Sequence, residues 1–309
     1  MSSRHCVYTT LIGGYERLNE QPVAKASSLP FICLTDDGHL ESETWQIQLV
    51  RPIFGMDPVR SQRELKIRPH AHLPGYGRSL YIDNSVVLTH PPELLFENQF
   101  PKTGLRLPEH SYRKTVLDEF VEVSRLGFDD QNRIFEQLNH YMCDNPSVLE
   151  EAPYWTAILL RDHGHAGLRD MLDIWASHVL RYSRRDQLSF NFACRHAGFK
   201  PDAWQIDNYE SWFHTWPHTA MRQRDKGMRS PALALSPPAA RIRSLEMALT
   251  EQEDKRQSLE MVIAAQELKH QKLVRNPGRI LKLAAKQTLR GWRSGLAGHP
   301  LGPEELGKP

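Results

Sequence analysis

Short apolar runs separated by turn-forming residues dominate the first ninety residues. Residues 5–12, 29–35, 45–50 and 80–82 each carry the β-branched and aromatic side chains that are typical of strands. Pro58 to His72 has helical spacing, with Asp57 as its expected N-cap and Pro58 at the first helical position. Strands that alternate with a helix predict an α/β fold with a mostly parallel central sheet.

The rest of the chain has longer helical segments. Helices are expected within residues 108–145 and 168–180, a strand near 155–160, and an aromatic loop over 204–216. We therefore predict one domain over residues 1–225, followed by a helical tail. The tail divides into a Pro/Ser/Ala-rich linker, a helix without Gly or Pro, and a basic amphipathic helix with an irregular end: residues 226–240, 241–274 and 275–309.

Charge separates the domain from the tail. Residues from 226 onward hold 15 Lys and Arg against 8 Asp and Glu, whereas residues 1–225 hold the remaining 24 against 29. An acidic domain argues against a general nucleic-acid-binding protein. The four cysteines are widely spaced, which favours reduced thiols over disulfides or structural zinc. The first residues lack a signal-peptide core and no apolar run is long enough to span a bilayer, so we expect a cytoplasmic protein.

Polar residues follow several of the expected strands. In open α/β sheets, ligands bind outside the carboxyl ends of strands. Thr10, Gly13, Gly14 and Tyr15 close the first strand, and Asp36-Asp37 closes the second, where either carboxylate could accept a hydrogen bond from a ribose or a base. Thr10, Gly13, Gly14, Tyr15 and, of the two aspartates, Asp36 are the candidate donor-binding residues, although ordinary turns would use the same residue types.

Asp83 ends the third buried strand, in the phrase Leu80-Tyr-Ile-Asp-Asn-Ser85. Arg60, Arg63 and Lys66 recur every three residues on the preceding helix, so we expect them to share one side and to bind a diphosphate. A solvated basic face is the alternative. Asp83 could bind Mn²⁺ or Mg²⁺, with His163 or His214 as a distant second ligand.

A dense block of charge lies at residues 181–190, Arg-Tyr-Ser-Arg-Arg-Asp-Gln-Leu-Ser-Phe. Arg184 and Arg185 carry donor forks that suit phosphate or carboxylate oxygens. Asp186 and Gln187 add an anion and an amide beside them. The block predicts either a sugar-nucleotide site or the salt-bridged start of a helix.

Several phrases together resemble the TOD/MUCI-like glycosyltransferase family, which is of the GT-A type. They occur in the family's order over about residues 5–215: Val7-Tyr-Thr-Thr-Leu-Ile-Gly-Gly-Tyr15, Phe31-Ile-Cys-Leu-Thr-Asp-Asp37, Asp57-Pro-Val-Arg-Ser-Gln-Arg-Glu-Leu-Lys66, Leu80-Tyr-Ile-Asp-Asn-Ser85, His110-Ser-Tyr-Arg113 with Glu119, Arg161-Asp-His163, and Arg184-Arg-Asp-Gln-Leu-Ser-Phe190.

The resemblance implies a Rossmann-like nucleotide-sugar domain that transfers a sugar from a nucleoside diphosphate to a glycan or glycolipid. It places Asp186, Gln187 and Asp83 among the catalytic candidates and His110, Arg113 and His163 on the acceptor or secondary side. Enzymes of the GT-A type usually carry Asp-x-Asp where this chain has Asp83-Asn84-Ser85, so metal dependence is left open. A bacterial surface-polysaccharide pathway is the expected setting.

The tail indicates partners for the enzyme. Arg279, Lys282, Lys286, Arg290 and Arg293 fall on one face of an expected helix, opposite an apolar face with Trp292. This pattern suits an anionic membrane surface on the cytoplasmic side, or docking on the chain's own acidic domain. Residues 241–274 follow an interrupted heptad that could join two copies. The alternative to an enzyme is a non-catalytic glycan-binding or scaffold protein of the same fold; nucleotidyl transfer is a third hypothesis.

Overall fold

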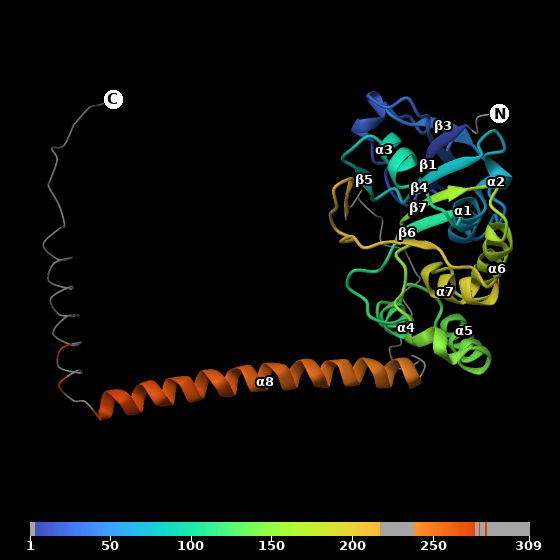
Figure 1. The fold of residues 1–309 in the computed structure, drawn as a ribbon. Helices are drawn as coiled ribbons and strands as arrows, with labels where there is room; N and C mark the ends of the chain where they lie inside the picture. The colour runs from blue at the N-terminus through green and yellow to red at the C-terminus, as the bar shows by residue number, and fades with distance from the viewer. Residues whose placement is uncertain (1–3, 217–237, 276–277, 279–281, 283–309) are drawn as a thin grey trace, which may run out of the picture. The chain divides into compact units, whose positions relative to one another are not determined.

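A seven-stranded sheet forms the centre of the computed structural model, which describes residues 4–216, 238–275, 278 and 282 (Figure 1). The strand order is β3-β2-β1-β4-β7-β6-β8. The strands are β1 (His5–Leu11), β2 (Phe31–Thr35), β3 (Gln46–Leu49), β4 (Arg78–Ile82), β6 (Leu105–Pro108), β7 (Ile158–Asp162) and β8 (Asp202–Trp204). β5 (Val87–Leu88) and β9 (His214–Thr215) pair separately.

Most strand pairs are parallel, as the sequence predicts. β3, β2, β1 and β4 run side by side in one direction, and β6 pairs in parallel with β8. β7 is antiparallel to both of its neighbours. The carboxyl ends of β1, β2 and β4 therefore meet at one edge of the sheet, whereas β7 ends at the opposite edge.

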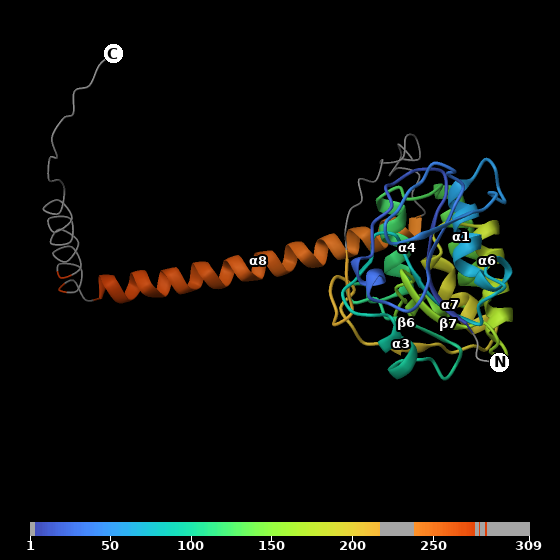
Figure 2. The same ribbon diagram turned by 90° about the horizontal axis from the view of Figure 1, so that it is seen from above.

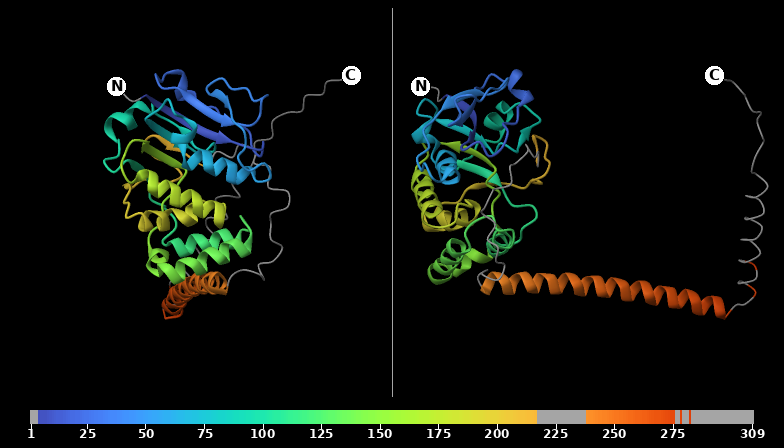
Figure 3. Two further views of the ribbon diagram at one scale, coloured as in Figure 1. Left: turned by 90° about the vertical axis from the view of Figure 1, so that its right-hand side faces the viewer. Right: turned by 180° about the vertical axis from the view of Figure 1, so that it is seen from behind.

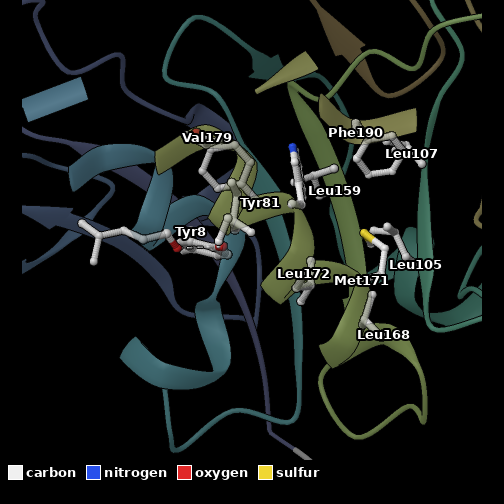
Figure 4. Packing of buried hydrophobic residues seen from close by; sticks show 14 of the residues in the cluster. Tyr8, Tyr81, Leu105, Leu107, Leu159, Leu168, Met171, Leu172, Val179 and Phe190 are labelled. Carbon is white, nitrogen blue, oxygen red and sulfur yellow. Dashed lines mark hydrogen bonds between the residues drawn. The ribbon is translucent and has the colours of Figure 1, made fainter. Parts of the chain in front are cut away.

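Helices cover one face of the sheet. They are α1 (Pro58–Ile67), α6 (Leu168–Arg181) and α7 (Gln187–His196), whose apolar side chains join the strands in one core. Figure 4 shows Leu168, Met171 and Leu172 of α6 beside Leu105 and Leu159 of the sheet. The expected helix over 58–72 is split into α1 and α2 (Pro69–His72), because a proline cannot donate the hydrogen bond that would continue the helix.

The other face of the sheet packs against α3 (Glu93–Asn98) and long loops. Leu95 and Phe96 of α3 lie in a second core with Trp45, Trp155 and other apolar side chains. Figures 1 and 2 show α3 and α1 on different sides of the sheet. Both faces of β1, β2 and β4 are thus buried, which explains why these strands read as nearly continuous apolar runs, whereas the edge strand β3 is mostly exposed.

Two further helices extend the domain beyond α7. α4 (Val116–Arg125) and α5 (Gln131–Asp144) pack with η2 (Pro146–Glu150) and with Leu188 and Phe192 of α7 in a third core (Figure 3). Gly127, at φ 64°, separates α4 from α5, so the helical pattern over 108–145 is two helices. η1 (Pro22–Lys25) is a short 3-10 helix in the loop after β1.

One buried cation ties β7 to α1. Arg161 is fully buried, and its Nη1 donates to the carbonyl oxygens of Lys66 at 2.7 Å and Ile67 at 3.2 Å. Its Nη2 donates to the hydroxyl of Tyr8. Its countercharge is therefore the carboxyl end of α1, where the helix dipole is negative.

The chain divides by its contacts into two units, one ending at Ser244 and the other beginning at Leu245. Helix α8 (Pro238–Val274) covers residues 241–274, for which the sequence predicts a helix. The expected linker lies outside the described residues up to 237, as does most of the expected basic helix from 275. Among the described residues, no helix is long and apolar enough to cross a membrane.

Candidate functional site

A cleft of about 350 Å³ opens at the carboxyl ends of β1 and β2. Its lining includes Leu11, Gly14, Arg17, Thr35, Asp37 and Leu40. Of the predicted donor-binding residues, Gly14 lines this cleft directly. Asp36 is exposed and accepts a hydrogen bond from the Gly13 amide at 2.9 Å, so its neighbour Asp37 faces the cleft instead.

Two other predicted residues lie at this end of β1. Thr10 is fully buried within the strand, where its side chain belongs to the interior of the sheet. Tyr15 is half-buried and packs against the core on the α3 side. Thr10 therefore has no side-chain atom at the surface, whereas part of the Tyr15 side chain is exposed.

Gly13 is required by its surroundings. Its φ is +80°, and a Cβ atom at this position would lie 2.7 Å from Cβ of Pro58. Both the left-handed backbone and the close approach exclude other residues. The turn after β1 is consequently pressed against the first residue of α1.

The three cations of α1 do not act together. Arg63 and Lys66 both pair with Asp186, but Arg60 donates to the carbonyl oxygens of Val179 at 3.0 Å and Tyr182 at 2.6 Å. Each step of three residues falls about 60° short of a full helical turn, so Arg60 and Lys66 point about 120° apart. The structure thus uses Arg60 to hold the end of α6, not to complete a set of three.

Asp186 is the centre of the site. Its side chain is 4% exposed and forms ion pairs with Lys66 Nζ at 2.7 Å and Arg63 Nε at 2.9 Å. Thr156 Oγ1 donates a further hydrogen bond to it at 2.8 Å. Burial alone would raise the pKa of Asp186, but the charges of Arg63 and Lys66 outweigh it and hold that pKa well below its usual range. Asp186 is therefore an anion at any ordinary pH.

Asp83 lies beside this centre, directly after β4. Its Oδ1 accepts a hydrogen bond from the Tyr81 hydroxyl at 2.7 Å and lies 3.3 Å from Lys66 Nζ. The Asp83 side chain is 27% exposed, in contrast to Lys66, which is 1% exposed. Lys66 thus bridges a buried and a partly accessible carboxylate, and Asp83 is the member of the pair that a ligand could reach.

The block at residues 181–190 is the corner at which α6 ends and α7 begins. Arg184 binds Asp129: its Nη2 lies 2.9 Å from Oδ1, and its backbone amide donates to Oδ2 at 2.6 Å. Arg185 is half-buried, and its guanidinium lies 5.0 Å from the ring centre of Phe128. Among the described residues, Nε of Arg185 and Nε2 of Gln187 are buried without a hydrogen-bond partner. The two residues that flank Asp186 therefore carry donors that a ligand could use.

A second polar cluster lies within electrostatic reach of Arg185. Glu119 is buried in α4, with its Oε2 3.4 Å from Arg113 Nε and 3.9 Å from His110 Nε2. Burial raises the pKa of Glu119 in spite of the opposing charges of Arg185 and Arg113. Burial and the charge of Arg113 lower the pKa of His110 to about 4, so His110 is neutral near pH 7. The predicted acceptor residues His110 and Arg113 thus gather around one carboxylate.

His163 does not lie near Asp83. It follows β7, whose antiparallel direction places it at the start of β4, about 13 Å along that strand from its end. Both ring nitrogens have partners, Ser79 Oγ at 2.8 Å and the Tyr76 carbonyl at 2.8 Å. The expectation that His163 joins Asp83 as a metal ligand is wrong, because the sequence pattern did not show that β7 reverses the direction of the sheet.

His214 is also occupied by its neighbours. Its Nδ1 lies 2.6 Å from Ser211 Oγ and its Nε2 lies 3.2 Å from the Asn208 carbonyl. Among the described residues, no group of three His, Cys, Asp or Glu side chains could hold a metal ion. The Lys66 ammonium already neighbours Asp83, so Asp83, His163 and His214 do not fit a divalent cation. The positive charge of this site comes from Lys66 and Arg63.

Sequence reasoning missed three residues that organise the site. Thr156 hydrogen-bonds Asp186, Tyr81 hydrogen-bonds Asp83, and Asp129 fixes Arg184. Tyr81 could have been found, since residues two apart on a strand share a face. Thr156 and Asp129 reach their partners across 30 and 55 residues, and no local pattern indicates such contacts.

Comparison with known proteins places this site in a family. Residues 34–211 match the TOD1/MUCI70, glycosyltransferase-like domain. Similar solved structures include a WbbM bifunctional glycosyltransferase in its apo form, with a TM-score of 0.38 and 9% identity over 67% of this chain and 39% of that chain. They also include apo mouse xyloside xylosyltransferase 1, with a TM-score of 0.39 and 10% identity over 66% of this chain and 85% of that chain.

The described chain spans about two fifths of the WbbM chain that it matches. No curated protein matches the sequence. The family match covers more than half of the 309 residues, including the cleft end of β2, all of α1, Asp83, the acceptor-side cluster and the α6–α7 corner. The chain therefore belongs to the TOD1/MUCI70 glycosyltransferase-like domain family.

Proposed function

We propose that this protein is an active glycosyltransferase that moves a sugar from a nucleoside diphosphate to a glycan or glycolipid acceptor. The observation that carries this proposal is the buried ion network of Asp186, Lys66 and Arg63 next to the accessible carboxylate of Asp83. The network lies at the same sheet edge as the cleft. Cations that are held in place before a ligand arrives can stabilise a departing diphosphate without reorganising.

In this proposal the donor lies across the carboxyl ends of β1, β2 and β4. The nucleoside occupies the cleft beside Gly14 and Asp37, and the diphosphate extends toward α1. Neighbouring strands are about 5 Å apart, so a nucleoside diphosphate is long enough to span from β2 to β4. The sugar then comes to lie near Arg185 and Gln187, whose donors are available to its hydroxyl and phosphate oxygens.

Asp186 has two roles in this arrangement. Its permanent negative charge orients Arg63 and Lys66, and it offsets positive charge that develops on the sugar as the bond to the diphosphate breaks. The acceptor approaches from the cluster around Glu119, where the neutral ring of His110 and the guanidinium of Arg113 can position a hydroxyl group. Orientation and charge stabilisation supply the catalysis.

The sequence left Mn²⁺ or Mg²⁺ open as a cofactor bound at Asp83, and the contacts of Asp83 favour a site that works without a metal ion. Only Asp83 offers a carboxylate in the expected place, and Lys66 Nζ lies 3.3 Å from it. We therefore assign no step to a metal ion. Addition of Mn²⁺ or of EDTA should leave donor affinity unchanged, and a clear effect of either would contradict this assignment.

We place the enzyme in bacterial surface-polysaccharide synthesis, at the cytoplasmic face of the membrane. The basic face of the tail, from Arg279 to Arg293, supports contact with anionic lipids, although it lies outside the described residues except for Lys282. We also propose that residues 241–274 join two copies of the chain.

A non-catalytic glycan-binding or scaffold protein is the second candidate function. It is favoured by Ser85, which stands where enzymes of the GT-A type usually carry the second aspartate of Asp-x-Asp. Nucleotidyl transfer is the third candidate. The three hypotheses differ in what they release from a sugar nucleotide.

A panel of sugar nucleotides tests the proposal by thermal shift and by slow donor hydrolysis. A ligand at 100 times its Kd stabilises the native state by about 2.7 kcal/mol, so the correct donor should raise Tm clearly. Arg185→Ala should lose this shift, whereas Arg181→Ala, a 60% exposed arginine of the same corner, should keep it. Release of nucleoside diphosphate supports transfer, stabilisation without release indicates a scaffold, and release of pyrophosphate indicates nucleotidyl transfer. No stabilisation by any donor would contradict the proposal.

A further inference from the structure

The exposed face of α8 carries a heptad seam. Leu245, Leu249, Leu259 and Ile263 follow the alternating spacing of four and three residues that is typical of coiled coils, and they are 53%, 69%, 63% and 54% exposed. In this frame Leu249 and Ile263 occupy a positions, and Leu245 and Leu259 occupy d positions. Four large apolar side chains on one line of a helix require a partner surface.

The charges beside the seam have an ordered pattern. The e positions from 246 to 267 are all acidic: Glu246, Glu253, Glu260 and Glu267. The g positions hold Ala248, Lys255, Val262 and Lys269, and carry no acid. In a parallel coiled coil each g residue faces the e residue of the next heptad on the partner, so Lys255 of one copy faces Glu260 of the other. In an antiparallel pair e faces e, and Glu would oppose Glu in every register.

The polar seam positions also favour one register. Gln252 and Gln266 occupy d positions, and in a parallel, in-register pair each amide meets its own copy and can hydrogen-bond to it. Arg256 occupies an a position, but it already pairs with Glu253 and, at 2.9 Å, with Glu260 of its own helix. Its charge is thus balanced before two helices meet. Polar residues at seam positions lower stability and specify register and the number of strands.

We infer that α8 joins two copies of this chain as a parallel, in-register coiled coil, with Lys255 of each copy paired to Glu260 of the other. Lys255 now contacts Glu251 of its own helix at 2.6 Å, an exposed pair that it can exchange for the new partner. This inference concerns assembly and does not depend on the reaction that the domain catalyses.

The oligomeric state is the first test, made on the full chain by sedimentation equilibrium. The expected mass is twice the monomer mass of 35.6 kDa. Leu259→Glu with Ile263→Glu should reduce the particle to a monomer. Met261→Glu is the matched control, because Met261 is 69% exposed and lies on the opposite side of the helix, and it should leave the dimer intact. A monomeric wild-type chain, or a monomer with Met261→Glu alone, would overturn the inference.

Crosslinking tests the orientation. In a Cys143→Ser background, which removes the one cysteine that is exposed among the four, Leu245→Cys should form a disulfide between copies under mild oxidation. Met247→Cys, 50% exposed and outside the seam, should not. An antiparallel pair centred on Arg256 would separate the two Leu245 positions by about 33 Å. A dimer in which Leu245→Cys fails to crosslink would therefore exclude the parallel arrangement.

Charge exchange tests the register. Lys255→Glu alone should weaken the dimer about five- to tenfold, since two exposed pairs become repulsive. Glu260→Lys alone should weaken it similarly. A mixture of the two variants should form a heterodimer with recovered affinity, because position 255 of each copy then faces an opposite charge at position 260 of the other. The double variant Lys255→Glu/Glu260→Lys should likewise restore both pairs in a dimer of identical chains. Failure of that double variant to recover wild-type affinity would overturn the assigned pair.

Discussion

Asp186→Asn is the most direct test of the buried ion network. The substitution keeps the size of the side chain and its ability to accept a hydrogen bond from Thr156. It removes the negative charge that lies 2.7 Å from Lys66 Nζ and 2.9 Å from Arg63 Nε. Breaking a buried ion pair by removing one partner costs about 3–5 kcal/mol, because the remaining charge stays buried.

The expected loss lies near the lower end of that range. Lys66 keeps a second carboxylate, Asp83, at 3.3 Å, whereas Arg63 has only Asp186 as an ion-pair partner within the described residues. We therefore expect Asp186→Asn to lower the free energy of unfolding by about 3 kcal/mol. A typical domain is stable by about 5–15 kcal/mol, so the variant should still fold.

Urea denaturation followed by tryptophan fluorescence measures this loss, with Trp175 as a nearby reporter whose indole donates to the Asp186 carbonyl. Glu43→Gln is the control: Glu43 pairs with Lys25 at 2.8 Å, but the pair is exposed, so no change in the urea midpoint is expected. Asp186→Asn combined with Lys66→Met should recover part of the loss. An unchanged midpoint for Asp186→Asn would refute the reasoning.

The dependence of stability on pH is a second test of the same ion network. A carboxyl group whose pKa is depressed by folding stabilises the native state above its unfolded pKa of about 3.9, and this contribution is lost as pH falls below that value. Wild-type protein should therefore lose stability steeply below about pH 4. Asp186→Asn lacks the titrating group, so its stability should fall less over the same range.

Three further predictions concern single side chains, and a fourth concerns the tail. Asp83→Ala should abolish transfer from the identified donor while changing the free energy of unfolding by no more than about 1 kcal/mol, because Asp83 is partly exposed; wild-type turnover would remove it from the site. Arg185→Lys should lower kcat/KM by about tenfold or more although the charge is kept, because an ammonium does not reproduce a planar two-point contact; unchanged kinetics would make this residue structural. Burial lowers the pKa of His163 to about 4, so the unfolded chain binds a proton below about pH 6.5 that the native chain does not. Stability should fall by up to about 3 kcal/mol from this residue between about pH 6.5 and pH 4, and His163→Gln should show a shallower fall in urea titrations; an identical slope would contradict this. Deleting residues 275–309 should release the protein from anionic vesicles without loss of transfer to a soluble acceptor, as judged by co-sedimentation at low salt; equal binding by both forms would exclude the tail as the anchor.

Local patterns were sufficient for the strands β1 to β4 and for α1 and α6, but not for the short strands β6 and β8 or for α3 and α7. The apolar run from His5 to Leu11 and the N-cap at Asp57 are set by neighbouring residues, so they could be read directly. The direction of β7 could not, because the same apolar run fits a parallel or an antiparallel neighbour. That single uncertainty moved His163 from the expected site to the opposite edge of the sheet.

Local patterns also predicted only part of the candidate site. Asp83, Arg63, Lys66 and Asp186 were all singled out from the sequence, and the structure brings these four together. The sequence could not show that Arg60 turns away. Helical spacing fixes the angle between side chains, but which of them faces the sheet edge depends on contacts with α6. Long-range partners decide the role of each arginine.

Arg161 has a consequence for the motions of the domain. Its guanidinium is stabilised by the last carbonyl groups of α1, and the dipoles of these groups are aligned toward it only while the helix is formed. Fraying of that turn would leave a buried cation without partners, which is far costlier than fraying at an exposed helix end. Amide protons of the last turn of α1 should therefore exchange with solvent only when the whole domain unfolds. The helix that carries Arg63 and Lys66 opens together with the sheet as one cooperative unit, so both cations stay beside Asp186 for as long as the domain is folded.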